Sequence, residues 1–307
     1  MIAAVIVTCR RPALLARAIA AALAQTSPPE RVLVIDNSVD LAVNAAVRAA
    51  FAADARVCFH LARDNLGGAG GYHLGLRLAL AAGAEAVWLL DDDAIAAPEA
   101  LAWLARTAAE FAPVGFVCSR VVWTDGSPAV MNQPVPAADW ARFLLPGQPV
   151  VKVRTATFVS LLVSAAVVRA KGLPAREFFV WYDDNDYTLR ITDDLTGLWE
   201  GRSVVVHEMA RNEGAAFETV TTASLWKYRY GVRNEIATVR HREGFAAALL
   251  RLFALGPRLR AVPGGRERRA LYRAAVRGLF FRYRVEFPKA DETFPELAAS
   301  VEGTRPR

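Results

Sequence analysis

Residues 86–93 read Ala-Val-Trp-Leu-Leu-Asp-Asp-Asp, an apolar run of strand type that ends in three adjacent aspartates. Because neighbouring carboxylates repel one another, a chain that places Asp91, Asp92 and Asp93 directly after a buried strand is expected to hold a cation there. Oxygen-rich acidic sites suit hard divalent ions such as Mg²⁺ or Mn²⁺, which keep open positions for substrate phosphates. Taken alone, the triplet fits a solvated acidic turn equally well.

The stretches around this run alternate between strand and helix patterns. Apolar, β-branched segments predict strands over 2–7, 32–35, 57–61 and 86–90, and helical spacing predicts helices over 12–23, 41–51 and 70–82. Continuous apolar strands separated by helices predict an α/β fold with a mostly parallel sheet that is covered on both faces. Ligands bind at the carboxyl ends of such strands, so we expect residues 8–11, Asp36 and the aspartate triplet to lie close together.

The second half of the chain is less regular. We predict a strand over 114–123, a loop over 131–148, a strand and short helix over 157–168, and a helix from 183 to Gly197. A strand over 204–206 then delivers His207, and the remainder is mainly helical with a break at 263–265. We therefore expect a catalytic domain over 1–222 and a basic helical segment over 223–307.

Charge is unevenly distributed along the 307 residues. Residues 225–284 hold 15 Lys or Arg against 3 Glu, whereas the rest holds 22 Lys or Arg against 28 Asp or Glu. A basic segment on an acidic body favours an anionic partner, with nucleic acid, a phospholipid surface and a lipid diphosphate as candidates. The acidic body argues against nucleic acid, so we expect no nucleic-acid partner. Three widely spaced cysteines, no signal-like start and no bilayer-length apolar run favour a cytoplasmic protein. Residues 245–255 are apolar with Arg251 embedded, and residues 279–281 lie among arginines, so we expect peripheral contact at the inner face of the cell membrane.

Three more groups of residues could take part in binding or catalysis. The loop Asn-Leu-Gly-Gly-Ala-Gly-Gly over 65–71 opens a helix and allows close approach of a phosphate, although a tight turn would have the same composition. Residues 181–186 read Trp-Tyr-Asp-Asp-Asn-Asp, which is either a capped helix start or a general base beside aromatic sugar platforms. His207 ends a strand and completes an ion site only if that strand end lies near Asp91 and Asp93.

These clusters, in this order, resemble the family 2 glycosyltransferases with the GT-A fold. The matching residues are Val5-Ile6-Val7-Thr8, Val34-Ile35-Asp36-Asn37, Asp64-Asn65-Leu66-Gly67-Gly68, Asp91-Asp92-Asp93, Trp181-Tyr182-Asp183-Asp184 and His207. The glycine loop, the Trp-Tyr-Asp-Asp segment and the run over 228–234 are similar to the galactofuranosyltransferase and rhamnosyltransferase branch. The resemblance covers roughly residues 1–240.

The resemblance implies a role for each matching position. The nucleotide and donor residues would be Thr8, Arg10 or Arg11, Asp36 on the base, Asn65, Gly67, Gly68, Asp91 and Asp92. Asp91 and Asp93 would form the family's DXD element and bind Mn²⁺ or Mg²⁺ with His207. Asp184 would be the catalytic base, beside an acceptor and sugar site of Trp181, Tyr182 and Asp183.

The resemblance also implies an activity, namely inverting transfer of a sugar to a hydroxyl of a glycan or polyprenyl-linked acceptor in cell-surface polysaccharide synthesis. Galactofuranose from UDP-galactofuranose is the first expectation, and rhamnose from dTDP-rhamnose is the second. The QXXRW element of processive members is not found, and neither is an N-terminal β-rich domain, so transfer of one or a few residues is expected. The sequence also leaves open a sugar-phosphate nucleotidyltransferase, a degenerate transferase and a non-enzymatic protein that binds anionic polymers.

Overall fold

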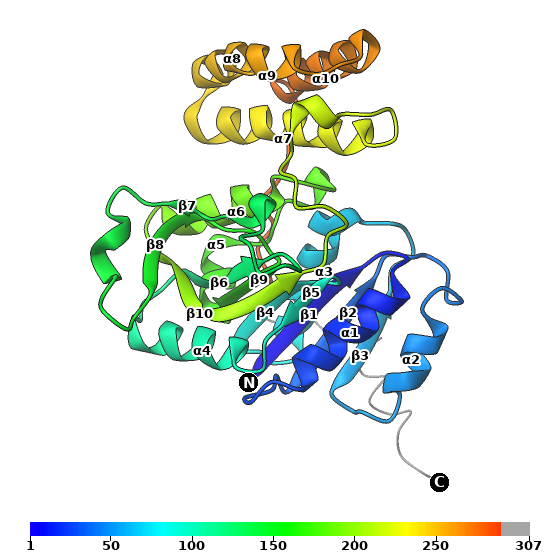
Figure 1. Ribbon diagram of the computed structural model, residues 1–307, viewed down its shortest axis with the longest axis vertical. Helices are drawn as coiled ribbons and strands as arrows, with labels where there is room; N and C mark the ends of the chain where they lie inside the picture. The colour runs from blue at the N-terminus through cyan, green and yellow to red at the C-terminus, as the bar shows by residue number, and fades with distance from the viewer. Residues whose placement is uncertain (290–307) are drawn as a thin grey trace.

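The computed structural model describes residues 1–289 and shows one large sheet with helices on both of its faces (Figure 1). The strands are β1 (Ile2–Thr8), β2 (Arg31–Asp36), β3 (Val57–Leu61), β4 (Ala86–Asp91), β5 (Ala94–Ala96), β6 (Phe116–Val122), β7 (Val135–Pro136), β8 (Val150–Thr155), β9 (Ser160–Ser164) and β10 (Gly197–His207). The helices are α1 (Pro12–Leu23), α2 (Ala45–Phe51), α3 (Gly67–Ala81), α4 (Ala100–Glu110), α5 (Ala165–Lys171), α6 (Asp183–Thr192), α7 (Leu225–Glu243), α8 (Phe245–Ala254), α9 (Gly256–Arg260) and α10 (Gly265–Gly278).

The sheet has the order β3-β2-β1-β4-β9-β6-β10-β8-β7, and β5 pairs with β10 outside this path. Strands β3, β2, β1 and β4 are parallel neighbours, and β6 is parallel to β10. Strand β9 lies antiparallel between β4 and β6 and joins the two parallel groups. The predicted α/β class with a mostly parallel sheet is therefore confirmed.

Each face of the sheet has its own apolar core. Helices α3, α5 and α6 pack on the face that carries Val5, Ile35 and Leu89. Helices α1, α2 and α4 pack on the opposite face. Helix α3 lies close to β1 because it presents Gly75 there; a Cβ at this position would lie 2.3 Å from Cγ1 of Val5. This close packing brings the glycine loop at the start of α3 to the carboxyl ends of the strands.

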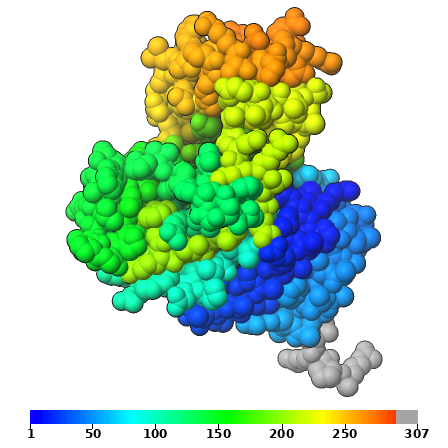
Figure 2. Space-filling model, in the orientation of Figure 1, coloured from blue at the N-terminus to red at the C-terminus, as the bar shows by residue number. Residues whose placement is uncertain are grey.

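Helices α7 to α10 form a lobe above the sheet body (Figures 1 and 2). They enclose a separate apolar cluster built around residues such as Ile236, Leu255 and Leu271. The phenol of Tyr283 ties the following segment back to the body, because it donates a 2.6 Å hydrogen bond to the buried carboxylate of Asp186. Within residues 1–289, no helix combines the length and the hydropathy that crossing a bilayer requires.

Several boundaries differ from the prediction. The helix predicted to end at Gly197 ends at Thr192, and Gly197 instead starts β10, where a Cβ would lie 2.5 Å from the ring of Phe116. This glycine relieves crowding in the sheet and does not cap a helix. The helix predicted over 41–51 begins only at Ala45, the one predicted over 70–82 already begins at Gly67, and β5 and β8 have no predicted counterpart. The predicted loop over 131–148 contains β7 and a 3₁₀ turn over Trp140–Phe143.

Candidate active site

A cavity of about 660 Å³ opens at the carboxyl ends of β1 and β4. Its walls also include the glycine loop, the start of α6, the end of β10 and the first three turns of α7. Thr8, Arg11 and the three adjacent aspartates all line it, together with Asp184 and His207. Parallel strands end at a common edge, and this geometry brings together residues that are far apart in the sequence.

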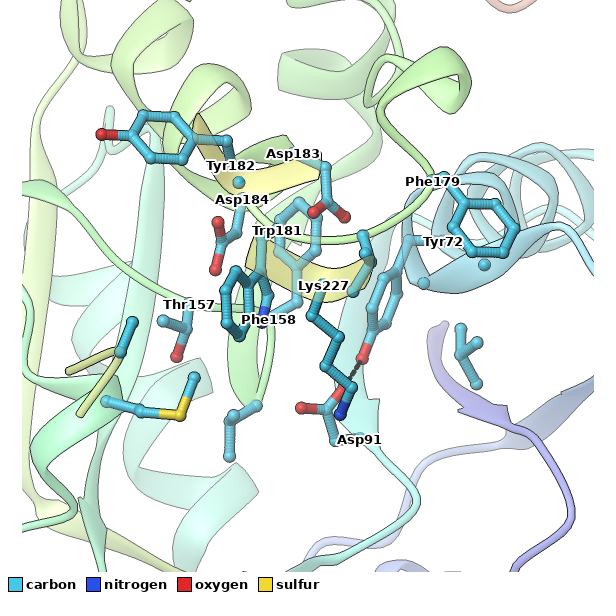
Figure 3. Close-up of a pocket in the computed structure, with 18 of the residues that line it drawn as sticks. Tyr72, Asp91, Thr157, Phe158, Phe179, Trp181, Tyr182, Asp183, Asp184 and Lys227 are labelled. Atoms are coloured by element: carbon cyan, nitrogen blue, oxygen red, sulfur yellow. Dashed lines mark hydrogen bonds between the residues drawn. The ribbon is translucent and has the colours of Figure 1, made fainter. Parts of the chain in front are cut away.

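Each carboxylate of the aspartate triplet has partners within the protein. Asp91 accepts a short hydrogen bond from the phenol of Tyr72 (Figure 3). Asp92 accepts a bond of 2.7 Å from the hydroxyl of Thr8. One guanidinium nitrogen of Arg11 lies 3.0 Å from a carboxylate oxygen of Asp92 and 2.7 Å from one of Asp93. These contacts offset the mutual repulsion that the sequence alone implies.

Asp91, Asp93 and His207 form a group that fits a divalent ion. Their ligand atoms all lie within 4.8 Å of one another. Nε2 of His207 lies 2.9 Å from Asp93, and Nδ1 lies 2.7 Å from Oδ1 of Asn132. An acceptor at Nδ1 fixes the tautomer that offers Nε2 to an ion. Two carboxylates with one imidazole suit Mn²⁺, whereas Mg²⁺ prefers oxygen ligands alone.

Burial and charge move the pKa values of this cluster in different directions. Burial raises the pKa of Asp92 to about 6, against the opposing effect of Arg11. Burial also works against the charge of Asp93, but the hydrogen bond with His207 and the charges of His207 and Arg11 outweigh it and lower the pKa of Asp93. Burial lowers the pKa of the His207 imidazole, but the hydrogen bond with Asp93 and the charges of Asp93 and Asp91 outweigh it and raise this pKa. The contact between Asp93 and His207 therefore favours the charged form of each partner.

The glycine loop packs directly on the segment before α6. Gly67 has a φ of +69°, and a Cβ there would lie 2.1 Å from the carbonyl oxygen of Phe179. The carbonyl oxygen of Gly67 accepts a 2.9 Å hydrogen bond from the side-chain amide of Asn37. The backbone N–H of Gly67 donates a hydrogen bond of 2.9 Å to the side-chain oxygen of Asn65. Only glycine fits this left-handed, crowded position. Asn65, Gly67 and Gly68 all line the cavity.

The segment before α6 holds an unusual backbone. Phe179, Trp181 and Tyr182 have φ values of 66°, 63° and 73°, a region that non-glycine residues seldom occupy. The side-chain amide of Asn234 on α7 stabilises it by bonding the carbonyl oxygens of Phe178, at 3.0 Å, and Trp181, at 2.8 Å. Strained backbone of this kind is characteristic of functional sites.

Two carboxylates follow this segment at the start of α6. Asp183 is buried, and desolvation together with the charge of Asp184 raises its pKa. Burial raises the pKa of Asp184 to about 6, although its carboxylate accepts a 2.7 Å hydrogen bond from the N–H of Asn185. Figure 3 shows Asp184 and the Trp181 ring on the cavity wall and the Tyr182 ring turned away from Asp91. Both residues line the cavity, and of the two rings that of Trp181 lies beside Asp184.

Six residues of α7 line the cavity, and none of them was predicted as a site residue: Trp226, Lys227, Tyr228, Gly231, Val232 and Glu235. Lys227 points toward Asp91 (Figure 3), and burial lowers the pKa of its amine. Trp226 precedes it in the same helix and also lines the cavity. Their sequence signal is present but ambiguous, because both belong to the basic segment, whose charge favours a surface for an anionic partner. Tyr72 and Asn132 were also missed, since each is a single polar residue within an apolar or irregular stretch.

Two predicted nucleotide residues do not line the cavity, namely Arg10 and Asp36. Asp36 is fully buried, and its carboxylate accepts 2.9 Å hydrogen bonds from the N–H of Ser38 and the amide of Asn44. With those bonds made, Asp36 shapes the loop after β2. The neighbouring Asn37 lines the cavity in its place.

The sequence was compared with known protein families and with proteins of known function. The model of the family "Glycosyl transferase family 2" matches residues 3–158, just over half of the chain. The chain is 46% identical over 91 residues to galactofuranosyltransferase GlfT1 of Mycobacterium tuberculosis (strain H37Rv), a stretch that covers 29% of this chain and 29% of that relative.

Two solved structures share the fold. GalNAc-T7, solved with UDP, GalNAc and Mn²⁺, matches with a TM-score of 0.59 at 11% identity, covering 78% of this chain and 47% of that one. Mannosyltransferase PcManGT from Pyrobaculum calidifontis, solved with GDP-Man and Mn²⁺, matches with a TM-score of 0.57 at 15% identity, covering 98% and 79%.

Proposed function

The chain belongs to glycosyl transferase family 2, and on that premise we propose that it is an inverting, Mn²⁺- or Mg²⁺-dependent galactofuranosyltransferase. The donor would be UDP-galactofuranose, and the acceptor a hydroxyl of a glycan or polyprenyl-linked glycan in cell-surface polysaccharide synthesis. The observation that carries the proposal is that Asp91, Asp93 and His207 share one cavity with Asp184. The stretch that resembles GlfT1 supports galactofuranose, and the ligands of the two structural neighbours support a nucleotide sugar with Mn²⁺.

The donor would lie across the strand ends. Thr8, Asn37, Asn65 and the glycines at 67 and 68 line the part of the cavity proposed for the nucleoside. Arg11 and Lys227 are cations on the same wall and would face the diphosphate. When bound to Asp91, Asp93 and His207, the ion neutralises the charge that builds on the departing nucleoside diphosphate.

Asp184 would take the proton from the acceptor hydroxyl as its oxygen attacks the anomeric carbon, and a single displacement inverts that carbon. Its raised pKa of about 6 leaves it mostly ionised at neutral pH while making it a stronger base than an ordinary aspartate. Trp181 would offer its ring to the sugar, with Asp183 beside it. Family membership favours this reaction over nucleotidyl transfer and over a purely anion-binding role.

We propose further that the protein contacts the cell membrane peripherally at its inner face through helices of the 225–284 segment. Leu250 and Phe253 on α8 are 71% and 77% exposed, and Phe280 after α10 is 70% exposed. Exposed arginines on α10, among them Arg269 and Arg273, add positive charge to the same lobe. Apolar side chains beside a cationic helix are typical of interfacial contact with anionic lipid.

The experiment that tests the proposed function is ligand-dependent thermal stabilisation with UDP, dTDP and GDP, each with and without Mn²⁺. Binding to the folded state alone raises the melting temperature by mass action. A shift with UDP that requires Mn²⁺ and disappears in Asp93→Ala supports the proposal. A preference for dTDP indicates a rhamnosyltransferase instead. If none of the nucleotides shifts the melting temperature, the cavity is not a nucleotide-sugar site and the proposal fails.

A further inference from the structure

A second cavity, of about 570 Å³, lies between α7 and the end of α10, and we name it the α7–α10 groove. It is lined by four aromatic residues, three arginines and one alanine: Trp226, Tyr230, Phe280, Phe281, Arg229, Arg233, Arg277 and Ala274. The α7 residues follow one another at intervals of three, one and three positions and so share one face of that helix. This groove is separate from the proposed donor cavity, but Trp226 lines both.

The charges of the groove are not neutralised within residues 1–289. No Asp or Glu lines it, and none of its three arginines pairs with a carboxylate in that part of the chain. Arg233 is engaged with backbone carbonyls and lies 3.8 Å from the centre of the Phe281 ring, so it has a structural task. Arg229 and Arg277 are exposed and without such contacts in residues 1–289, which leaves two guanidinium groups for an anion.

The apolar part of the groove is uncovered. Phe280 is 70% exposed and Trp226 is 46% exposed, although both are large apolar side chains. Tyr230 and Phe179 stack with ring centres 5.0 Å apart and extend this aromatic surface toward the donor cavity. A ligand that matches the groove therefore needs a phosphate-type anion and a narrow hydrocarbon body in one molecule.

We propose that the α7–α10 groove binds the diphosphate and the first isoprene units of a polyprenyl-diphosphate-linked acceptor. This inference rests on the proposed function, because that function supplies the acceptor. Arg229 and Arg277 hold the diphosphate, and Phe280 and Tyr230 contact the chain. Trp226 belongs to both cavities, so the acceptor sugar passes over it toward Asp184. A single isoprenoid chain fits a cavity of this size, whereas a bilayer surface does not enter it.

The test is isothermal titration calorimetry of the full chain with farnesyl diphosphate and, separately, with inorganic pyrophosphate, below the micelle concentration and without vesicles. We expect farnesyl diphosphate to bind at least tenfold more tightly than pyrophosphate, because only the former contacts the aromatic residues. The double substitution Arg229→Gln and Arg277→Gln should weaken farnesyl diphosphate binding at least tenfold. The matched control, Arg266→Gln with Arg273→Gln, removes two exposed α10 charges outside the groove and should leave it unchanged.

A second measurement separates this proposal from the function on which it rests. UDP binding with Mn²⁺ should be the same in the wild type and in both double variants, which also shows that they fold. If UDP fails to bind but farnesyl diphosphate binds in an arginine-dependent manner, the groove assignment holds and the proposed function fails. Competition between UDP and farnesyl diphosphate, equal weakening by both double variants, or binding only to anionic vesicles overturns the groove assignment.

Discussion

Arg11 makes the sharpest prediction for this site, because it contacts Asp93, one of the carboxylates that would hold the ion. One of its guanidinium nitrogens lies 2.7 Å from Asp93 and 3.0 Å from Asp92. An ion bound by Asp93 has to share or displace this contact. The substitution Arg11→Gln removes the competing charge, so it should strengthen the binding of Mn²⁺ in the absence of nucleotide.

The size of the effect follows from the geometry. Two unit charges about 4 Å apart interact by ~4 kcal/mol at an effective dielectric constant of ~20. The Arg11 side chain is 47% exposed, and pairs exposed to water are worth ~1 kcal/mol or less. Two screened contacts therefore give about 1–2 kcal/mol, which corresponds to binding that is ~5–30-fold tighter. The effect on UDP affinity should be opposite. At saturating Mn²⁺, Arg11→Gln should bind UDP ~10-fold more weakly than the wild type if the guanidinium turns from the carboxylates to the diphosphate.

Mn²⁺ affinity is measured from the electron paramagnetic resonance signal of the free ion, and UDP affinity by calorimetry. The comparison variant is Arg10→Gln, which makes the same charge change one residue away, outside the cavity. It should alter neither affinity by more than ~2-fold. The reasoning is refuted if Arg11→Gln leaves Mn²⁺ affinity unchanged or weakens it, or if Arg10→Gln reproduces its effects.

Three further predictions concern the base, the strained segment and the lobe. The proposed base is the ionised form of Asp184, and the pKa of this carboxyl is about 6. We therefore expect kcat/KM for the acceptor to fall about tenfold per pH unit below that pH, where an unshifted aspartate would still be ionised. A profile that is flat down to pH 5 contradicts the assignment. Asn234→Ala leaves the carbonyls of the strained segment unbonded and should lower the free energy of unfolding by ~1–3 kcal/mol in urea titrations; Asn185→Ala, which removes a local bond only, should cost less. Leu250→Ser with Phe253→Ser should abolish flotation with anionic vesicles at low salt while leaving UDP binding intact; wild-type protein that does not float removes the basis for membrane contact.

The parts of the site that were predictable from the sequence share one physical cause. Strand ends of a parallel sheet meet at one edge, so Thr8 and the aspartate triplet could be brought together from local patterns alone, whereas His207 was placed there only by the family resemblance. The structure places all of them, and Asp184, on one cavity. The same argument included Asp36, yet Asp36 turns into the protein because Ser38 and Asn44 satisfy its carboxylate. The position of a strand end is a sheet property, whereas the direction of one side chain depends on its neighbours.

The parts that were not predictable depend on contacts between distant segments. Gly197 has the sequence context of a helix end, and only the proximity of Phe116 explains why a glycine is needed there. Strands β5 and β8 both pair with β10. The register of β10 against β6 shifts between Glu200 and Val204. No local pattern specifies that pairing. The sequence alone does not predict that Lys227 lines the cavity, because the position of this side chain depends on how α7 packs against the sheet body.

The docking of α7 argues that the basic helices do more than meet an anionic partner. Asn234 holds the carbonyls of the strained segment, and that segment leads directly into Asp183 and Asp184. Gly231 makes the docking possible, because a Cβ there would lie 2.8 Å from the ring of Trp181. The same helix contributes Lys227 to the cavity. A boundary at residue 222 stays a prediction, but a cut there would remove both the support of the proposed base and one of the two cations proposed for the diphosphate. Truncation should therefore abolish turnover of even a soluble acceptor, a loss that weaker membrane contact would not produce.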